Sequence, residues 1–246
     1  MKKNLKAAIF DMDGVITDTA RLHAHAWKAM FDEYNKSLAA NKRETFEPFS
    51  IKQDYPVYLD GVPRYQGVAS FLQSRSIDLP FGSPSDEPAK ETVCGLGNRK
   101  NQLFHEILDE TGVVILEDNV EVIIELKDRG YKTAVISSSK NCKEVLERAG
   151  LLYLFPVRVD GVISKERGLK GKPEPDIFLE AARELGVNPE ETLIVEDALA
   201  GIEAAKKGNF LHIIGIGSDN QRHMMVKAGA DEVVSSLMEA ELFAEI

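Results

Sequence analysis

The feature that most restricts the fold of this chain is an alternation of short apolar runs with helical patterns from about Asn119 onward. The runs YKTAVISSS, TLIVED, LHIIGIG and DEVVSS read as strands, and an earlier run, AAIF, begins at Ala7. Helical patterns lie between them in NVEVIIELKDRG, NCKEVLERAG, PDIFLEAARELG and ALAGIEAAKKG. Such an alternation is typical of parallel βαβ units with right-handed crossovers. We therefore predict an α/β fold, a Rossmann-like parallel sheet with helices on both faces.

The segment 19–114 has a different pattern. TARLHAHAWKAMFDEY and GNRKNQLFHEILDE are predicted helices, and the stretches between them, such as DLPFGSPSDEP, are rich in Pro, Gly, Ser and Asp. Because strand signals are sparse between two parts of an α/β pattern, this segment is predicted to be an inserted, mostly helical cap domain. The core domain would then comprise residues 1–18 and 115–246.

Composition restricts the class of partner. The 246 residues are 43% hydrophobic and 28% charged, with a net charge of -10 and a pI near 5.1. That charge repels nucleic acid and anionic membranes, so neither is an expected partner. The start MKKNLKAAIF has too short an apolar run for a signal peptide, no stretch approaches a membrane span, and Cys94 and Cys142 are too few for a disulfide framework. We expect a cytoplasmic protein with reduced thiols. No pattern in the sequence indicates its oligomeric state.

Polar residues follow the predicted strands where each one ends. Ligands of open parallel sheets bind beyond the carboxyl ends of the strands, and a further lysine lies in the turn GKPEPD before a helix. Two pairs of carboxylates would form an oxygen-rich site suited to Mg²⁺, while the lysine and the serine would bind phosphate oxygens. The residues concerned are, in chain order, Asp11, Asp13, Ser137, Lys172, Glu196 and Asp197.

Each of these features also has a structural explanation. The DMDG stretch could be a turn, Ser137 a strand-end hydroxyl, Lys172 a solvated surface lysine, and Glu196 with Asp197 a helix cap and its neighbour. Their joint occurrence in this order favours a phosphate site. The basic segment KERGLKGK around it is predicted to be a solvated loop.

The motif set resembles the haloacid dehalogenase superfamily of phosphotransferases. Asp11, Asp13 and Gly14 match its first motif, and the later motifs are matched by the serine, lysine and Glu-Asp pair named above. The resemblance implies that Asp11 is a nucleophile that forms an aspartyl-phosphate and that Asp13 is the general acid/base. It also implies Mg²⁺ as the cofactor, held by Asp11, Asp13, Glu196 and Asp197.

Further stretches are similar to the β-phosphoglucomutase group of that superfamily: DGVITDTA, LDGVPR, RKN and SSSKN. This resemblance implies that Arg64 binds the phosphate remote from the nucleophile and that Lys100 reaches a sugar. His23 and Trp27 have alternative readings, as an interfacial histidine and a packing residue. The whole implied substrate-binding set is His23, Trp27, Gly61, Arg64, Lys100, Ser138, Ser139, Lys140 and Asn141.

The resemblance implies a phosphomutase that interconverts β-D-glucose 1-phosphate and glucose 6-phosphate through a sugar 1,6-bisphosphate. A phosphatase acting on small sugar phosphates is the alternative. A sugar-phosphate binding protein without catalysis would be expected to lack Asp11 or Asp13, and both are present. Additional cap segments around NKRETFEPFSIKQDYPVY and YQGVASFLQSRSIDLPFGSPSDEP leave the identity of the sugar open.

Overall fold

The structure is a computed structural model that describes residues 4–42 and 47–243. Contacts divide the chain into two compact units, Met1–Asp18 with Val113–Ile246 (the core) and Thr19–Gly112 (the cap). Residues 43–46, which belong to the first additional cap segment, lie outside the described residues.

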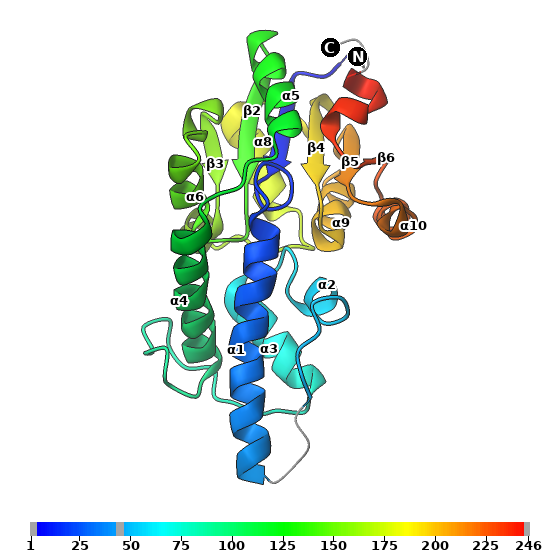
Figure 1. Cartoon of the computed structure of the whole chain (residues 1–246). Helices are drawn as coiled ribbons and strands as arrows, with labels where there is room; N and C mark the ends of the chain where they lie inside the picture. The colour runs from blue at the N-terminus through cyan, green and yellow to red at the C-terminus, as the bar shows by residue number, and fades with distance from the viewer. Residues whose placement is uncertain (1–3, 43–46, 244–246) are drawn as a thin grey trace. The chain divides into compact units, whose positions relative to one another are not determined.

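Within the described residues, six strands form one parallel sheet in the order β3-β2-β1-β4-β5-β6, as Figure 1 shows. Their bounds are β1 Ala7–Asp11, β2 Lys132–Ile136, β3 Val157–Val159, β4 Thr192–Glu196, β5 His212–Ile216 and β6 Glu232–Val234. The predicted parallel sheet is confirmed.

The position of β1 determines where the polar strand ends meet. It lies between β2 and β4, with Asp11 in register with Ile136 and Phe10 with Val195. Because the strands are parallel, their carboxyl ends share one edge of the sheet. Ser137 and Glu196 therefore end the two strands that flank Asp11.

Helices cover both faces of the sheet. The helices α8 Asp176–Leu185, α9 Leu199–Lys207 and α10 Asp219–Ala228 contribute Phe178, Ile202 and Met225 to an apolar cluster with Ile9 and Ile136. Helix α5, Glu117–Asp128, packs against β2 with apolar residues outside this cluster. The helix α6, Cys142–Arg148, follows the loop after β2. The helices predicted between strands are thus confirmed as α5, α6, α8 and α9.

Among the described residues, sequence reasoning missed two helices and one strand of the core: α7 Gly161–Arg167, α10 and β3. Helix α10 gives a weak signal because only its Met225 is buried. Strand β3 has three residues, VRV, and its central Arg158 interrupts the apolar signal. Helix α7 includes Lys165 and Arg167 of the segment KERGLKGK, so the prediction of a loop there was wrong. The helix begins because the buried side chain of Asp160 accepts hydrogen bonds from the amides of Val162 and Ile163.

The cap is helical in the described residues, as predicted. Its helices are α1 Thr19–Lys42, α2 Tyr55–Tyr58, α3 Arg64–Ser74 and α4 Val93–Thr111. An aromatic cluster fills the centre, where Phe31 lies 4.1 Å from Phe71 and 5.4 Å from Phe49 between ring centroids. Thr92 caps α4 by accepting a hydrogen bond from the Gly95 amide.

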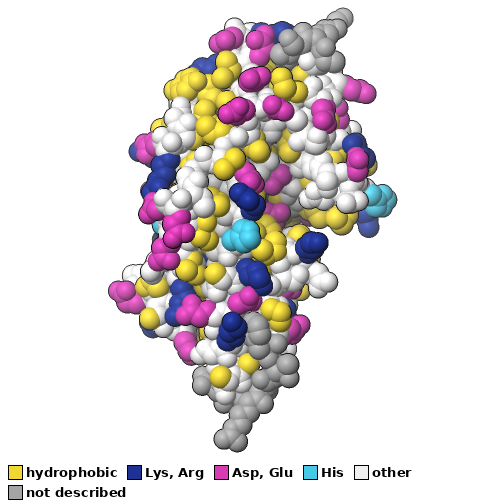
Figure 2. Space-filling view, in the orientation of Figure 1, with side chains coloured by type: hydrophobic (Ala, Val, Ile, Leu, Met, Phe, Trp, Pro, Cys, Tyr) yellow, Lys and Arg dark blue, Asp and Glu magenta, His cyan; other side chains and the backbone are white. Residues whose placement is uncertain are grey.

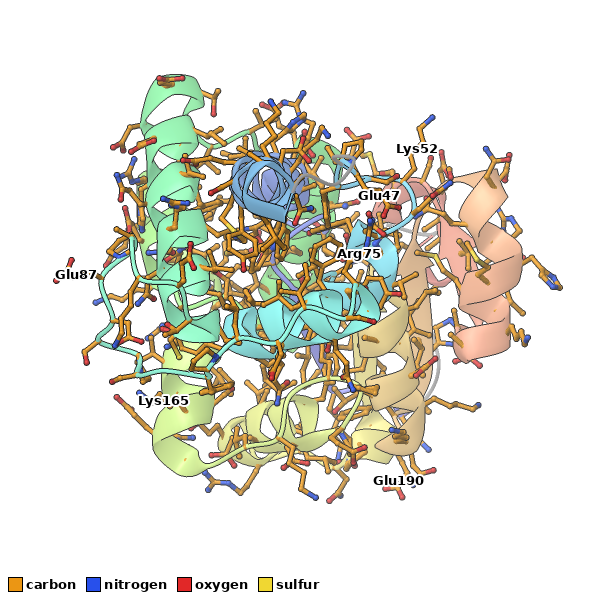
Figure 3. The ribbon with its side chains drawn as sticks, turned by 90° about the horizontal axis from the view of Figure 1, so that it is seen from below. Glu47, Lys52, Arg75, Glu87, Lys165 and Glu190 are labelled. Atoms are coloured by element: carbon orange, nitrogen blue, oxygen red, sulfur yellow. The ribbon has the colours of Figure 1, made fainter. Side chains whose placement is uncertain are left out.

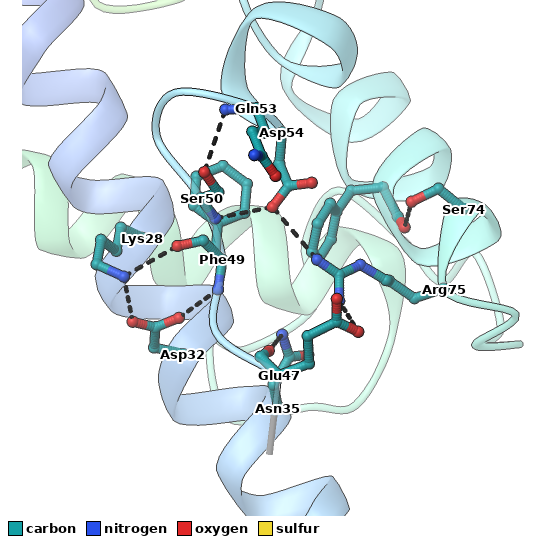
Figure 4. Close-up of polar contacts among 11 residues, drawn as sticks. Lys28, Asp32, Asn35, Glu47, Phe49, Ser50, Gln53, Asp54, Ser74 and Arg75 are labelled. Carbon is teal, nitrogen blue, oxygen red and sulfur yellow. Dashed lines mark hydrogen bonds and ion pairs between the residues drawn. The ribbon is translucent and has the colours of Figure 1, made fainter. Parts of the chain in front are cut away.

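The described part of the first additional cap segment is tied to α1. The carboxylate of Asp32 accepts a hydrogen bond from the Phe49 amide at 2.7 Å, and Lys28 donates to Asp32 and to the Phe49 carbonyl at 2.8 and 2.9 Å (Figure 4). Both polar groups of the Phe49 backbone are thereby satisfied while its ring enters the aromatic cluster.

The same segment is also tied to the end of α3 by Arg75. Its guanidinium forms ion pairs with Glu47 and, at 3.3 Å, with Asp54, and it lies 5.2 Å from the centroid of the Phe71 ring. Figure 3 shows Arg75 and Glu47 turned toward each other. The described part of this additional segment is therefore a structured part of the cap.

On the face drawn in Figure 2, acidic and basic side chains of the described residues are intermixed. None of the described helices is long and apolar enough to cross a membrane. Both cysteines, Cys94 and Cys142, are buried free thiols.

Candidate active site

The site begins with the tight loop that follows β1. Gly14 has a φ of +81° and donates a hydrogen bond to the Thr17 carbonyl at 2.7 Å, while the amides of Ile16 and Thr17 donate to the Met12 carbonyl. The positive φ favours glycine at this position. This loop holds Asp13 next to Asp11, whose Oδ2 accepts a hydrogen bond from the Asp13 amide at 3.0 Å.

Lys172 joins carboxylates from two strands. Its Nζ is 2.6 Å from Asp11 Oδ1 and also forms an ion pair with Glu196 Oε1. The three side chains are almost fully buried, and Glu196 Oε2 accepts a hydrogen bond from the Ala198 amide at 2.9 Å. Because buried charges must be compensated, the lysine stabilises both carboxylates.

The electrostatic consequences are large at Asp11. Burial raises the pKa of the Asp11 carboxyl well above its ordinary value, Lys172 opposes this, and the neighbouring Glu196 and Asp13 raise the pKa further. Burial lowers the pKa of Lys172, but the two carboxylates outweigh burial and raise it above its ordinary value. An additional cation at the site would favour the ionised form of Asp11.

Two glycines allow the carboxylates to approach the backbone. A Cβ atom on Gly14 would lie 1.9 Å from Asp197 Oδ2, and one on Gly201 would lie 1.9 Å from Glu196 Oε1. Asp197 is therefore packed against the loop that carries Asp13. The absence of a side chain at these two positions leaves room for the carboxylates of Asp197 and Glu196.

Ser137 connects β2 to the same loop. The buried hydroxyl donates a hydrogen bond to Asp13 Oδ2 at 3.0 Å and accepts one from the Ser139 amide at 3.0 Å. Ser139 in turn accepts a hydrogen bond from the Asn141 amide at 3.1 Å through its hydroxyl. The loop that carries Ser138, Lys140 and Asn141 is thus anchored at the carboxyl edge of the sheet.

The donor set fits a hard divalent cation. The converging groups are all oxygen donors and most are carboxylates, which is the ligand chemistry of Mg²⁺. In the described residues, no group of three or more His, Cys, Asp or Glu side chains is arranged around one point as a metal site. Lys172 instead contacts two of the four predicted ligands, Asp11 and Glu196.

A second group of predicted residues lies together in the cap. Lys100, on α4, is 4% exposed, and its Nζ is 2.5 Å from Nδ1 of His23 on α1. The ammonium also lies 4.9 Å from the Trp27 ring centroid and 5.1 Å from that of Phe104. Since an ammonium can only donate, Nδ1 accepts, and the proton of a neutral His23 ring is assigned to Nε2.

Arg64 starts α3 beside α4. One terminal nitrogen of its guanidinium donates a hydrogen bond to Asn101 Oδ1 at 2.6 Å. Burial lowers the pKa of Arg64, and the interaction with Tyr65 acts in the opposite direction. Among the described residues, no Asp or Glu forms an ion pair with Arg64. Gly61, also predicted, has a φ of +68° in the turn before α3.

Sequence reasoning missed residues that hold the predicted ones. Phe104 stacks on His23 with ring centroids 4.1 Å apart, and its spacing of four residues from Lys100 on one helix was the available signal. Asn119 donates to the Val15 carbonyl at 2.8 Å and accepts from the Leu237 amide at 2.7 Å, which ties the β1 loop to a distant segment. No local pattern indicates that contact.

The fold is a parallel α/β core with a helical insertion after its first strand. Paired carboxylates, a serine and a lysine lie at one edge of its sheet. Together these features define a class of phosphate-processing enzymes. The chain belongs to the haloacid dehalogenase-like hydrolase family, whose model matches residues 5–209. The family resemblance read from the motifs is thereby confirmed.

Relatives span nearly the whole chain. A β-phosphoglucomutase of Mycobacterium bovis is 45% identical over 242 residues, which cover 97% of this chain and 92% of the relative. A phosphorylated carbohydrates phosphatase of Thermotoga maritima is 30% identical over 234 residues, with 94% of each chain covered. The crystal structure of a β-phosphoglucomutase from Clostridium difficile has a TM-score of 0.74 and 27% identity, covering 98% of this chain and 96% of that one.

Proposed function

We propose that this protein is a phosphomutase that interconverts β-D-glucose 1-phosphate and glucose 6-phosphate through a sugar 1,6-bisphosphate. The observation that supports the proposal is that two separate groups of side chains have the chemistry to bind phosphate. One is the Asp11, Asp13, Ser137 and Lys172 group of the core, and the other is the uncompensated Arg64 of the cap. The similarity to a mycobacterial β-phosphoglucomutase supports the same function.

In the first step, a carboxylate oxygen of Asp11 attacks the phosphorus of a bound phosphate. An O–P bond to Asp11 forms as the bond to the departing sugar oxygen breaks, and Asp13 donates a proton to that oxygen. The hydrogen bond from Ser137 and the tight β1 loop orient the Asp13 carboxyl group. In the second step, Asp13 takes the proton of a sugar hydroxyl, whose oxygen attacks the phosphoryl group and releases Asp11.

Mg²⁺ would be held by the carboxylates of Asp11, Glu196 and Asp197 and the backbone of Asp13. When bound, it supplies positive charge that offsets the repulsion between the Asp11 carboxylate and the phosphate. Lys172 supplies a further positive charge at the same edge of the sheet.

The cap residues would hold the sugar and its second phosphate. A half-buried guanidinium without a carboxylate partner is suited to an incoming anion, and guanidinium–phosphate contacts are strong and directional. Arg64 would bind the phosphate that is not being transferred. Ser139, Lys140 and Asn141 of the core are further candidates for binding phosphate. Lys100 and His23 would contact sugar hydroxyls.

The second candidate is hydrolysis of small sugar phosphates by the same nucleophile. The similarity to the phosphatase of Thermotoga maritima favours it. The two functions differ in the second step, because in a phosphatase water, rather than a sugar hydroxyl, attacks the aspartyl-phosphate.

The deciding experiment follows the products formed from β-D-glucose 1-phosphate with Mg²⁺ and a catalytic amount of glucose 1,6-bisphosphate. A mutase accumulates glucose 6-phosphate without net release of inorganic phosphate. Release of inorganic phosphate in proportion to substrate consumed would establish the phosphatase instead.

A further inference from the structure

The start of α3 is packed unusually closely on α4. A Cβ atom on Gly97 would lie 2.8 Å from Cδ1 of the Tyr65 ring and 3.3 Å from Cδ of Arg64. Position 97 therefore forms a notch in α4 against which the aliphatic part of Arg64 and the ring of Tyr65 lie. The polar end of Tyr65 then reaches Asn98, next to Gly97, and that of Arg64 reaches Asn101, one turn further along the same helix.

Two asparagines on α4, three residues apart and so on the same face of the helix, accept hydrogen bonds from these polar ends. Asn101 Oδ1 accepts from the Arg64 guanidinium at 2.6 Å, and Asn98 Oδ1 accepts from the Tyr65 hydroxyl at 2.9 Å. A guanidinium has only donors, which requires the oxygen of the Asn101 amide to face it. The contact with Asn101 fixes the guanidinium plane without neutralising its charge.

Asn98 also connects this arrangement to the second additional cap segment. Its Nδ2 donates to the carbonyls of Pro84 and Asp86 at 3.1 and 2.8 Å. The Asp86 carboxylate itself accepts hydrogen bonds from the Ser83 amide at 3.0 Å and the Thr92 hydroxyl at 2.8 Å. The part of this segment that follows α3 is thus organised by Asp86 and held on α4 through Asn98.

We propose that Asn101 and Asn98 are positioning residues that fix Arg64 in the orientation in which it binds the non-transferred phosphate. Asn101 acts directly on Arg64. Asn98 acts through Tyr65 and is itself held by its hydrogen bonds to the carbonyls of Pro84 and Asp86. This inference rests on the proposed function, because it assigns a role in binding the bisphosphate of that reaction. It also gives the second additional cap segment a role in substrate recognition.

The proposed positioning role depends on the neutral charge of the amide at position 101. A carboxylate there would bind Arg64 more strongly, but it would neutralise the charge that a phosphate requires. If Asn101 had only a structural role, Asn101→Asp would be tolerated better than Asn101→Ala. Asp preserves the shape of the side chain and strengthens its contact with Arg64, whereas Ala removes the contact. The variants Asn101→Asp and Asn101→Ala therefore separate the two roles.

The experiment measures calorimetric binding of glucose 1,6-bisphosphate with Mg²⁺ present, in an Asp11→Asn background that blocks transfer. We expect Asn101→Ala to weaken binding by about 5- to 10-fold, the loss of one orienting hydrogen bond, and Asn101→Asp by at least about 30-fold. Tyr65→Phe, which removes the hydroxyl bonded to Asn98, should weaken binding by about 2- to 5-fold. Gln102→Ala, at an exposed position on α4, is the matched control and should bind normally.

Melting temperatures and the hydrolysis of p-nitrophenyl phosphate, measured with Asp11 intact, complete the test. Asn101→Asp should melt at or above the temperature of Asn101→Ala and should hydrolyse this single-phosphate ester at the control rate. If Asn101→Asp binds the bisphosphate as tightly as the control, or better than Asn101→Ala, the positioning role is overturned. Arg64→Ala distinguishes failure of the positioning role from failure of the proposed function. If Arg64→Ala also binds the bisphosphate normally, the proposed distal-phosphate site is refuted as well; if it binds weakly, only the positioning role is refuted.

Discussion

Replacing Lys172 with Met removes the cation that contacts both Asp11 and Glu196 while largely keeping the volume of the side chain. Removing one partner of a buried ion pair costs about 3–5 kcal/mol, because a charge is left uncompensated in the interior. Here the Glu196 side chain is 0% exposed and that of Asp11 is 7% exposed. Each carboxylate keeps one backbone amide donor, from Ala198 or Asp13. We therefore expect a loss near the lower limit, about 3 kcal/mol.

Urea unfolding followed by circular dichroism measures this loss. The titrations are run with excess chelator and again with Mg²⁺, and Lys170→Met, at an exposed lysine nearby, is the control. If the carboxylates form the metal site, Mg²⁺ should stabilise the Lys172→Met protein more than the wild type, because the unpaired carboxylates attract it more strongly. A cation present at 100 times its Kd adds about 2.7 kcal/mol.

Two results would refute this reasoning. In chelator, an unfolding free energy of Lys172→Met within about 1 kcal/mol of the control would mean that the ion pairs do not compensate the buried carboxylates. Equal stabilisation of the variant and the wild type by Mg²⁺ would mean that the cation does not bind to Asp11 and Glu196.

Four further predictions concern the proposed chemistry and the cap. Asp11→Asn should abolish turnover without loss of fold, because an amide does not attack phosphorus; a labelled phosphoenzyme in this variant would exclude Asp11 as the nucleophile. Asp13→Asn should slow sugar transfer by about 10²- to 10⁴-fold, and unchanged steady-state rates would remove it from the mechanism. Arg64→Ala should cost about 1.5–3 kcal/mol of bisphosphate binding in calorimetry but leave hydrolysis of a single-phosphate ester nearly unchanged; a proportional loss in both would assign Arg64 to cap structure. Hydrogen bonds, chiefly from Lys90, lower the pKa of Asp86 to about 2, so its stabilising effect is complete above the ordinary carboxyl pKa and is lost as the pH falls through about 2. Thermal melts between about pH 5 and pH 2 should show a smaller acid-induced loss for Asp86→Asn, and identical profiles would contradict the role of Asp86.

The additional cap segments illustrate how far local patterns can be read. No helix was predicted in either segment, yet α2 lies in the first and most of α3 lies in the second. The stretch DLPFGSPSDEP of the second is rich in Pro, Gly, Ser and Asp, which is typical of loops. The described part of the first is nevertheless held between α1 and α3 by Asp32 and Arg75, and the part of the second that follows α3 is organised by Asp86. Asp32 and Arg75 lie outside the first segment, so its contacts with them have no signature within it. Asp86, in contrast, accepts a hydrogen bond from the Ser83 amide of its own segment.

Local sequence patterns were enough to predict the strands next to the site and the types of residue at their ends. An apolar run that stops at Asp11, Ser137 or Glu196 is a local signal, because burial and strand propensity act within a few residues. The helices α1, α4, α5, α8 and α9 were predictable for the same reason, whereas α3 and α10, of similar length to α8, were not predicted. Strand β3 and helix α7 were not predictable, since three residues and one helical turn or two give too few apolar positions to define a period.

Tertiary contacts determine which of these residues lie close together. The strand order puts β1 between β2 and β4, and this adjacency brings Lys172 to the carboxylates of two strands 185 positions apart along the chain, Asp11 and Glu196. In the cap, the absence of a side chain at Gly97 lets Arg64 reach Asn101. Such contacts depend on strand order, helix packing and the free energy of burying charges together. A local pattern in the sequence records none of these, because each involves residues that come together only when the chain folds.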